Sequence, residues 1–417
     1  MAAERRVDFG RLDRYLAMRY GPWKLMASVV LKTLLPMRLI AHQALAADPA
    51  DIVLLHPHAP GRRRHGRIVA GLTRRGLTVR EEIMPRPREL FAERKLCAPA
   101  AGWDSVPRRW RLQAAFAAWL VARYRPRLVV TFMDDTVHTP FLHAALARSG
   151  GTLANLSHTI CFPMIDFSMC DVDWFILFGQ RSLENLAVTP VRYGACRAIV
   201  AGSPYLVDQA VAREPASAPR EPPRLLWLGQ YALPLQRVAL EHDLASFARF
   251  VVAHPEYDVT VRLHPLDSGE TRAFLEPLAP RLRWMPPERL LPEVLGDFDI
   301  VLSSFSAGVI DAAASGKPIV AFSTNGLAAT LGLEDVGLPL VKDDAGLAAA
   351  VKRLESDYAR ASAAALRLAR EHYYKLDDAT ERIAELLATM ARGGDVAALG
   401  LPMRDLDWKM PGATATT

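Results

Sequence analysis

Short apolar segments alternate with longer helix-like segments along most of this chain. They lie at residues 51–55, 77–83, 128–133, 152–157, 174–178 and 198–201, and again at 225–228, 259–263, 299–302 and 318–322. Strands that are apolar along their whole length and separated by helices indicate parallel sheets buried on both faces. Residues 212–223, which contain four prolines, interrupt the alternation. The pattern therefore predicts an α/β protein with two doubly wound, Rossmann-like domains that face a cleft.

The alternation and its interruption predict five parts. Residues 1–50 form an N-terminal helical segment, 51–208 a first Rossmann-like domain and 209–223 a Pro-rich linker. Residues 224–345 form a second Rossmann-like domain, and 346–417 form C-terminal helices and a tail.

The charge is divided unevenly between the two halves. Residues 1–208 carry a net charge of +12 and the remainder carries −6. A basic half either meets an anionic partner or places arginines on solvated faces. Its arginines are scattered without interleaved aromatic residues, so nucleic acid is not expected as a partner. Four cysteines without CxxC spacing favour a reducing compartment and disfavour a cysteine zinc site.

Residues 25–46 are the most apolar stretch near the start. Lys32, Pro36 and Arg38 interrupt it, so it is too broken for a spanning helix of about 20 residues or for a signal peptide. Basic residues beside apolar ones predict an amphipathic helix, which either lies on a membrane surface or packs as an ordinary first helix. We expect a cytoplasmic protein, peripheral on the inner face of the inner membrane if this helix meets lipid.

A basic loop follows the first expected strand, where no GxGxxG occurs. His56, Pro57 and His58 lead into residues 61–66, which read GRRRHG. This loop either holds an anionic acceptor or is a solvated face.

In the second half, two strand ends carry polar side chains. His264 and Pro265 end the expected strand 259–263, at the edge where open parallel sheets bind ligands. Ser303, Ser304 and Ser306 follow the strand 299–302 and precede a helix, with Ser306 as the expected N-cap. Hydroxyl and imidazole donors near a helix N-terminus suit a phosphate. Asp311, one turn further, would reach a ribose hydroxyl.

These motifs resemble the donor half of GT-B glycosyltransferases that use cytidine-nucleotide donors. The similar families are bacterial polysialyltransferases, Kdo transferases and CDP-glycerol glycerophosphotransferases. The resemblance implies that His264-Pro265 and the serine motif hold the donor phosphate and cytidine, so that residues 51–208 are the acceptor side and 224–345 the donor side. Asp311 stands where many relatives carry Glu.

The first half carries weaker parts of the same pattern. Asp134 and Asp135 resemble the acidic-pair loop of sialyltransferases, although Thr136 replaces the usual Gly. His158 resembles the centre of a QHG-like segment in which Ser157 and Thr159 replace Gln and Gly. The resemblance continues through Gly179 and a GSP turn at residues 202–204.

No metal or other cofactor is expected. Asp171-Val-Asp173 spells DxD but precedes a buried strand, and a cytidine monophosphate leaving group can be stabilised by His and Ser donors. No GxSxG, HExxH or P-loop motif is present.

The resemblance implies a metal-independent, inverting glycosyltransferase. It would move a Kdo- or sialic-acid-type sugar from a CMP donor to a glycan or lipid-linked glycan acceptor, in capsule or lipopolysaccharide synthesis. The alternatives are transfer of glycerol or polyol phosphate from a CDP donor, a nucleotide-sugar epimerase of the same architecture, and a non-catalytic partner of a capsule-assembly complex.

Three residues are candidates for the general base. Asp135 or Asp134 could take the acceptor proton, because one member of a carboxylate pair has a raised pKa. His158 titrates near neutrality without such help.

Overall fold

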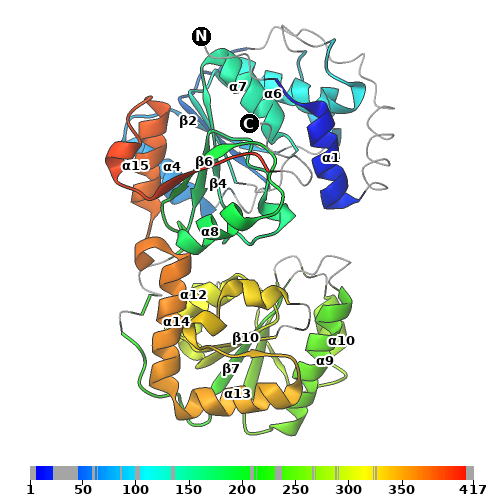
Figure 1. Ribbon diagram of the computed structural model, residues 1–417, viewed down its shortest axis with the longest axis vertical. Coiled ribbons are helices and arrows are strands. Elements are labelled where there is room, and N and C mark those ends of the chain that lie inside the picture. Colours follow the sequence, from blue (N-terminus) through cyan, green and yellow to red (C-terminus); the bar gives the residue numbers. More distant parts are fainter. Residues whose placement is uncertain are drawn as a thin grey trace. The chain divides into compact units, whose positions relative to one another are not determined.

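The computed structural model forms two compact units (Figure 1). Unit 1 comprises Met1–Pro204 and Ala379–Thr417, and unit 2 comprises Tyr205–Asp378. The structure describes residues 6–21, 46–58, 62, 64–84, 87–98, 104–132, 137–206, 211–212, 214–230, 237–264, 267, 269–286, 289, 291–322, 324 and 326–409.

Unit 1 is built on a seven-stranded sheet in the order β13-β6-β5-β4-β3-β1-β2. The strands are β1 (Ile52–His56), β2 (Val79–Ile83), β3 (Leu128–Thr131), β4 (Thr152–Leu156), β5 (Trp174–Leu177), β6 (Cys196–Val200) and β13 (Met403–Leu406). All neighbours pair in parallel except β13, which runs antiparallel to β6. Every residue of β1 and β3 is buried, as expected for strands covered on both faces.

Helices cover this sheet on both sides (Figure 1). They are α1 (Phe9–Tyr20), α4 (Gly66–Arg74), α5 (Pro87–Ala92), α6 (Arg111–Tyr124), α7 (Thr139–Ser149), α8 (Gln180–Val188) and α15 (Thr380–Ala391). Helix α15 packs on α4, and α6 packs on α7.

Unit 2 has a six-stranded, fully parallel sheet in the order β12-β11-β10-β7-β8-β9. Its strands are β7 (Arg224–Leu228), β8 (Asp258–Arg262), β9 (Arg283–Trp284), β10 (Ile300–Ser303), β11 (Ile319–Phe322) and β12 (Leu340–Val341). Its helices are α9 (Arg237–Ala253), α10 (Glu270–Leu275), α11 (Leu291–Val294), α12 (Gly308–Ala314), α13 (Asp344–Ser356) and α14 (Tyr358–His372). Trp227 on the central strand stacks on Phe247 of α9 at 4.1 Å and lies beside Phe322 at 5.7 Å.

The two Rossmann-like domains expected from the sequence are therefore confirmed. Each expected strand coincides with an observed one to within two residues at either end. Most of them are apolar runs, which are recognisable because a parallel strand is buried on both faces, whereas β2 and β8 carry polar residues and are only partly buried. Strands β9 and β12 span two residues each, and β13 carries two exposed residues, so they show no such run.

The domain boundaries differ from the predicted ones. The expected linker, 209–223, belongs to unit 2, where the backbone N–H of Ala212 donates to the Ala314 carbonyl and that of Ala216 to Ser362 Oγ. A proline-rich segment can dock in this way through its remaining N–H groups. The expected C-terminal part, 346–417, is divided: α13 and α14 belong to unit 2, but α15 and β13 belong to unit 1.

The N-terminal segment contributes a helix to the core of unit 1. Leu12, Tyr15 and Leu16 of α1 are buried, and Tyr15 Oη donates to the Ile165 carbonyl at 3.0 Å. Residues 22–45, which hold most of the expected amphipathic helix, lie outside the described residues. None of the helices that the structure describes is both long enough and apolar enough to cross a membrane.

Candidate functional site

The sheet of unit 2 reverses its strand order between β7 and β10. Helices that follow these two strands pack on opposite faces, which opens a crevice at the carboxyl ends of the strands. The register aligns these ends, because Leu228 pairs with Ser303 of β10 on one side and with Arg262 of β8 on the other. The residues just beyond Leu228, Arg262 and Ser303 therefore share one edge of the sheet.

Gly229 brings the ends of β7 and β8 into close contact. Its N–H donates to the Arg262 carbonyl at 2.8 Å. A Cβ at this position would lie 3.1 Å from the Arg262 oxygen, 3.2 Å from the His264 nitrogen and 3.3 Å from Leu263 Cα. All three are backbone atoms, so a side chain would force the strand ends apart. Gly229 thus fixes where the half-buried His264 emerges, whereas Pro265 lies outside the described residues.

The three serines after β10 have different environments. Ser303 is fully buried and its Oγ donates to the Leu228 carbonyl at 3.0 Å, so this hydroxyl holds β10 to β7. Ser304 is 3% exposed, and its Oγ has no hydrogen-bond partner among the described residues. Ser306 Oγ accepts the Gly308 N–H at 3.3 Å. The expected N-cap is corrected by one residue: α12 begins at Gly308 after Ala307, and Ser306 instead closes a short turn before it.

Asp311 lies in α12 and is held in place by a buried tyrosine. Tyr373, at the end of α14, donates its hydroxyl to Asp311 Oδ1 at 2.7 Å. Burial and the neighbouring carboxylate raise the pKa of Tyr373 well above its usual value, so it remains a donor. A ribose hydroxyl, the contact expected for Asp311, would have to share this carboxylate with Tyr373.

Two further polar residues at this edge were not identified from the sequence. Gln230 directly follows Gly229 and is 8% exposed, and its Oε1 has no partner within the described part of the chain. Asp243 on α9 is 2% exposed; burial raises its pKa to about 6, against smaller opposing effects of Ser304 and His242. Neither Ser304 Oγ nor Asp243 Oδ1 has a hydrogen bond of ordinary geometry to the described residues. Gln230 could have been found as the polar residue after an apolar strand, but Asp243 lies within a helix and gives no such signal.

These residues form one polar group at the carboxyl edge. His264 and Ser304 flank β7, about 10 Å apart given the spacing of neighbouring strands, and Gln230 follows β7 itself. Such an arrangement suits an extended polar ligand rather than a single ion. Among the described residues, no group of three or more His, Cys, Asp or Glu side chains is arranged to hold a metal ion.

The candidate bases of unit 1 are only partly described. Asp134 and Asp135 lie outside the described residues. His158 is exposed just beyond the carboxyl end of β4, at the edge where ligands of open α/β sheets bind.

The DxD sequence has a structural role. His143 of α7 is 1% exposed, and its Nδ1 lies 2.8 Å from the Asp171 carbonyl and 3.2 Å from Asp171 Oδ1. Its Nε2 lies 3.1 Å from Asp173 Oδ1, and Asp173 Oδ2 accepts the Leu153 N–H. Both carboxylates are therefore engaged within unit 1.

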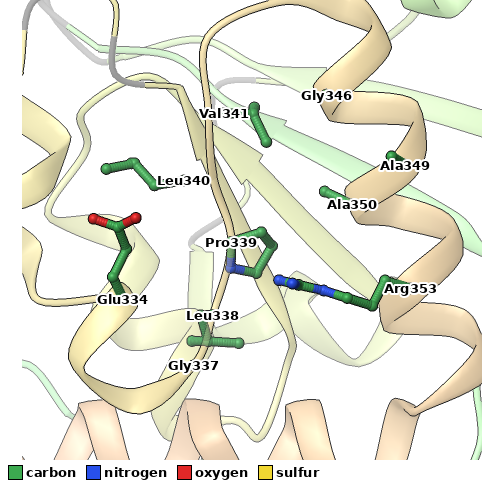
Figure 2. A pocket seen from close by; sticks show the side chains of 10 residues that line it. All are labelled: Glu334, Gly337, Leu338, Pro339, Leu340, Val341, Gly346, Ala349, Ala350 and Arg353. Carbon is green, nitrogen blue, oxygen red and sulfur yellow. The ribbon is translucent and has the colours of Figure 1, made fainter.

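A groove of about 440 Å³ lies elsewhere in unit 2, between β12 and α13 (Figure 2). Its apolar floor includes Pro339, Leu340 and Ala350, and the Arg353 side chain extends beside Pro339. Strand β11 separates β12 from β10, and none of the expected donor residues that the structure describes lines this groove. It is therefore distinct from the candidate site.

The fold and this edge define a two-domain α/β architecture of the GT-B type. Solved structures with this fold include UDP-GlcNAc 2-epimerase from Neisseria meningitidis bound to UDP-GlcNAc, with a TM-score of 0.54 and 13% identity over 81% of this chain and 99% of that one. They also include a glycosyltransferase from Rickettsia africae, with a TM-score of 0.51 and 12% identity over 82% of this chain and 99% of that one. At 12–13% identity, this structural similarity shows a shared fold only. No family model and no curated protein matches the sequence.

Proposed function

We propose that the chain is a nucleotide-sugar-dependent glycosyltransferase whose donor binds at the carboxyl edge of the unit 2 sheet. The observation that carries the proposal is the pair of buried polar atoms, Ser304 Oγ and Gln230 Oε1, that have no hydrogen-bond partner among the described residues around His264. Buried polar atoms without partners are costly, and a ligand that supplies the missing hydrogen bonds removes this cost.

The chemistry follows from the groups at this edge. The Ser304 hydroxyl and the His264 imidazole would donate to the phosphate oxygens of the leaving nucleotide, and this stabilisation requires no metal. Gln230 would accept from a hydroxyl or an amine of the nucleoside. Inverting transfer also needs a base for the acceptor hydroxyl, and Asp135, Asp134 and His158 remain the candidates from the motif resemblance.

The proposal also concerns which nucleotide-sugar is the donor. The HP and serine motifs support a CMP donor carrying a Kdo- or sialic-acid-type sugar. The Neisseria relative, bound to UDP-GlcNAc, supports a UDP-sugar on the same fold. The acceptor that we propose is a surface glycan or lipid-linked glycan, reached at the inner face of the membrane through the basic N-terminal segment.

Epimerisation is the second candidate, because that same relative is an epimerase. An epimerase converts the nucleotide-sugar without an acceptor, whereas a transferase releases the nucleotide only when an acceptor is present. Incubation with and without a glycan acceptor therefore separates the two activities.

Calorimetric titration with CMP, CDP, UMP, UDP and ADP tests the site directly. We expect one pyrimidine nucleotide to bind best, and Ser304→Ala and His264→Ala each to weaken its binding by about 10- to 100-fold. Ser356→Ala is the matched control, since Ser356 Oγ donates to the Lys352 and Arg353 carbonyls at the end of α13. If both site variants bind like the control, the donor site is wrongly assigned. If the nucleotide binds but neither transfer nor epimerisation occurs, the protein is a non-catalytic binding partner.

A further inference from the structure

The groove between β12 and α13 (Figure 2) lies at an open edge of the unit 2 sheet. Strand β12 is the last strand of the sheet order and pairs in parallel with β11, where Leu340 stands opposite Ala321. The Ala321 N–H donates to the Pro339 carbonyl, so Ala321 bonds to the residues on either side of Leu340, as in any parallel ladder. The N–H and C=O of Leu340 itself therefore point away from the sheet, where no strand of the described residues pairs with them.

One flank of helix α13 faces this open edge. Four of its residues line the groove, namely Gly346, Ala349, Ala350 and Arg353. Their spacing of three and four residues places them along a single face of the helix. Three of the four have no side-chain atom beyond Cβ, so a second helix could approach this flank closely. Another flank of α13 is already covered, because it packs on α9, where Asp344 binds Arg249 at 2.9 Å.

The two ends of this flank carry opposite charges. Arg353 is exposed near the C-terminal end of α13. Asp343, the exposed N-cap residue, accepts the Gly346 N–H at 2.7 Å, and its Oδ1 would lie 3.1 Å from a Cβ on Gly346. These two side chains form no ion pair with any residue that the structure describes. They are ten residues apart, about 15 Å along a helix, so they are too distant to bind each other.

We propose that this edge of unit 2 binds a second copy of the chain, with α13 and β12 of one copy antiparallel to α13 and β12 of the other. A two-fold axis near Ala349 and Leu340 would place Arg353 of one copy opposite Asp343 of the other. This contact occurs twice, because two-fold symmetry exchanges the partners. The two Leu340 residues would exchange N–H···O=C bonds, so that the two six-stranded sheets continue into each other.

The charge pattern favours a second copy over another partner. A helix that covers this flank must offer small residues at its centre, with a cation and an anion about 15 Å apart. Helix α13 itself has this pattern and is complementary to its own antiparallel copy. A parallel copy would place Arg353 against Arg353, and the two like charges would repel. The apolar floor formed by Pro339 and Leu340 would be removed from water in the same step.

Sedimentation velocity of the full chain tests this association without any nucleotide. At about 100 µM we expect a dimer that dissociates on dilution. Arg353→Glu would place a carboxylate opposite each Asp343, and we expect the dissociation constant to rise by about 100-fold. Adding Asp343→Asn removes the repulsion and keeps the N-cap, since Asn also caps helices, so about tenfold of the affinity should return.

The matched control is Arg360→Glu on α14. Arg360 is exposed and lies 3.6 Å from Asp357, so its reversal changes the net charge equally but lies outside the proposed interface. We expect this variant to associate like the wild type, and thermal unfolding to show that all the variants are folded. A wild-type monomer at about 100 µM, or a dimer that Arg353→Glu leaves intact, would overturn the proposal.

Disulfide formation tests which residues meet at the axis. Ala349 is exposed and would lie beside Ala349 of the other copy, so we expect Ala349→Cys to form a covalent dimer on mild oxidation. The four native cysteines are buried. Ala359→Cys, at an exposed position of α14, is the control and should remain monomeric on a denaturing gel. Cross-linking of Ala359→Cys but not of Ala349→Cys would place the contact on another face and overturn the proposal.

Discussion

Replacing His143 in unit 1 should destabilise the protein most at acidic to neutral pH. Burial alone would lower the pKa of His143, but its hydrogen bonds to Asp171 and Asp173 outweigh burial and raise it. A group whose pKa is raised on folding binds its proton more tightly in the folded state. Its stabilisation is fully present below the unfolded value of about 6.5 and is lost as the pH rises through the folded value.

The size of the effect follows from the contacts. His143→Gln removes two ring contacts to carboxylate oxygens, at 3.2 and 3.1 Å, and leaves Asp171 and Asp173 without their cation. Breaking a buried ion pair by removing one partner costs about 3–5 kcal/mol. Because Asp173 is 37% exposed, we expect a smaller loss than this, about 2–3 kcal/mol at pH 6. For a domain of this size that corresponds to a fall in melting temperature of about 5–10 °C.

Differential scanning calorimetry of both proteins from pH 5.5 to 9 measures this effect. The difference in melting temperature should be largest near pH 6 and should shrink toward pH 9. His254→Gln is the control, since His254 pairs with Glu256 at the surface, where an ion pair contributes less than about 1 kcal/mol. A His143→Gln difference that is constant over the whole range would refute the charged state of His143.

Two other substitutions test packing at the edges of the units. Gly229→Ala should weaken nucleotide binding by about tenfold, measured by calorimetric titration, because its Cβ would displace the backbone at His264. Gly71→Ala would normally favour α4, but its Cβ would lie 2.8 Å from Ala384 Cβ of α15. We expect it to lower stability by about 1–3 kcal/mol, and Ala384→Gly to restore part of the loss in a double-mutant cycle measured by thermal unfolding. Additive losses would contradict this α4–α15 contact.

The fold could be predicted from the sequence because its signal is local. A parallel strand buried on both faces is an apolar run. Ten of the thirteen strands in the described part of the chain coincide with an expected strand, although β2 and β8 also carry polar residues and are only partly buried. The chain returns from unit 2 to unit 1 at the C-terminus, and no local sequence pattern shows this return. That arrangement depends on α15 packing against α4 and on β13 pairing with β6, which are contacts between residues more than 200 positions apart.

Part of the candidate site could be predicted for the same local reason. His264 and the serines stand directly after apolar strands, and in a parallel sheet such positions share one edge. Their individual roles could not be predicted, because a hydroxyl next to a strand end can bond either to a ligand or to the protein. Ser303 bonds to the neighbouring strand, whereas the Ser304 hydroxyl is buried without such a bond.

The two clusters around buried histidines show what sequence spacing cannot convey. Asp171-Val-Asp173 has the spacing of a metal-binding motif, yet its carboxylates bind His143, whose ring comes from α7 about thirty residues earlier. His56 ends β1 and His65 lies in the basic loop after it, a loop that suggested an anion site. His56 Nε2 nevertheless lies 3.0 Å from Glu81 Oε1, and the His65 ring is stacked on Phe132. In both clusters the partner that decides the charge of the imidazole comes from a different strand or helix. The carboxylates of Asp171 and Asp173 raise the pKa of His143 against the effect of burial, whereas burial lowers the pKa of His65.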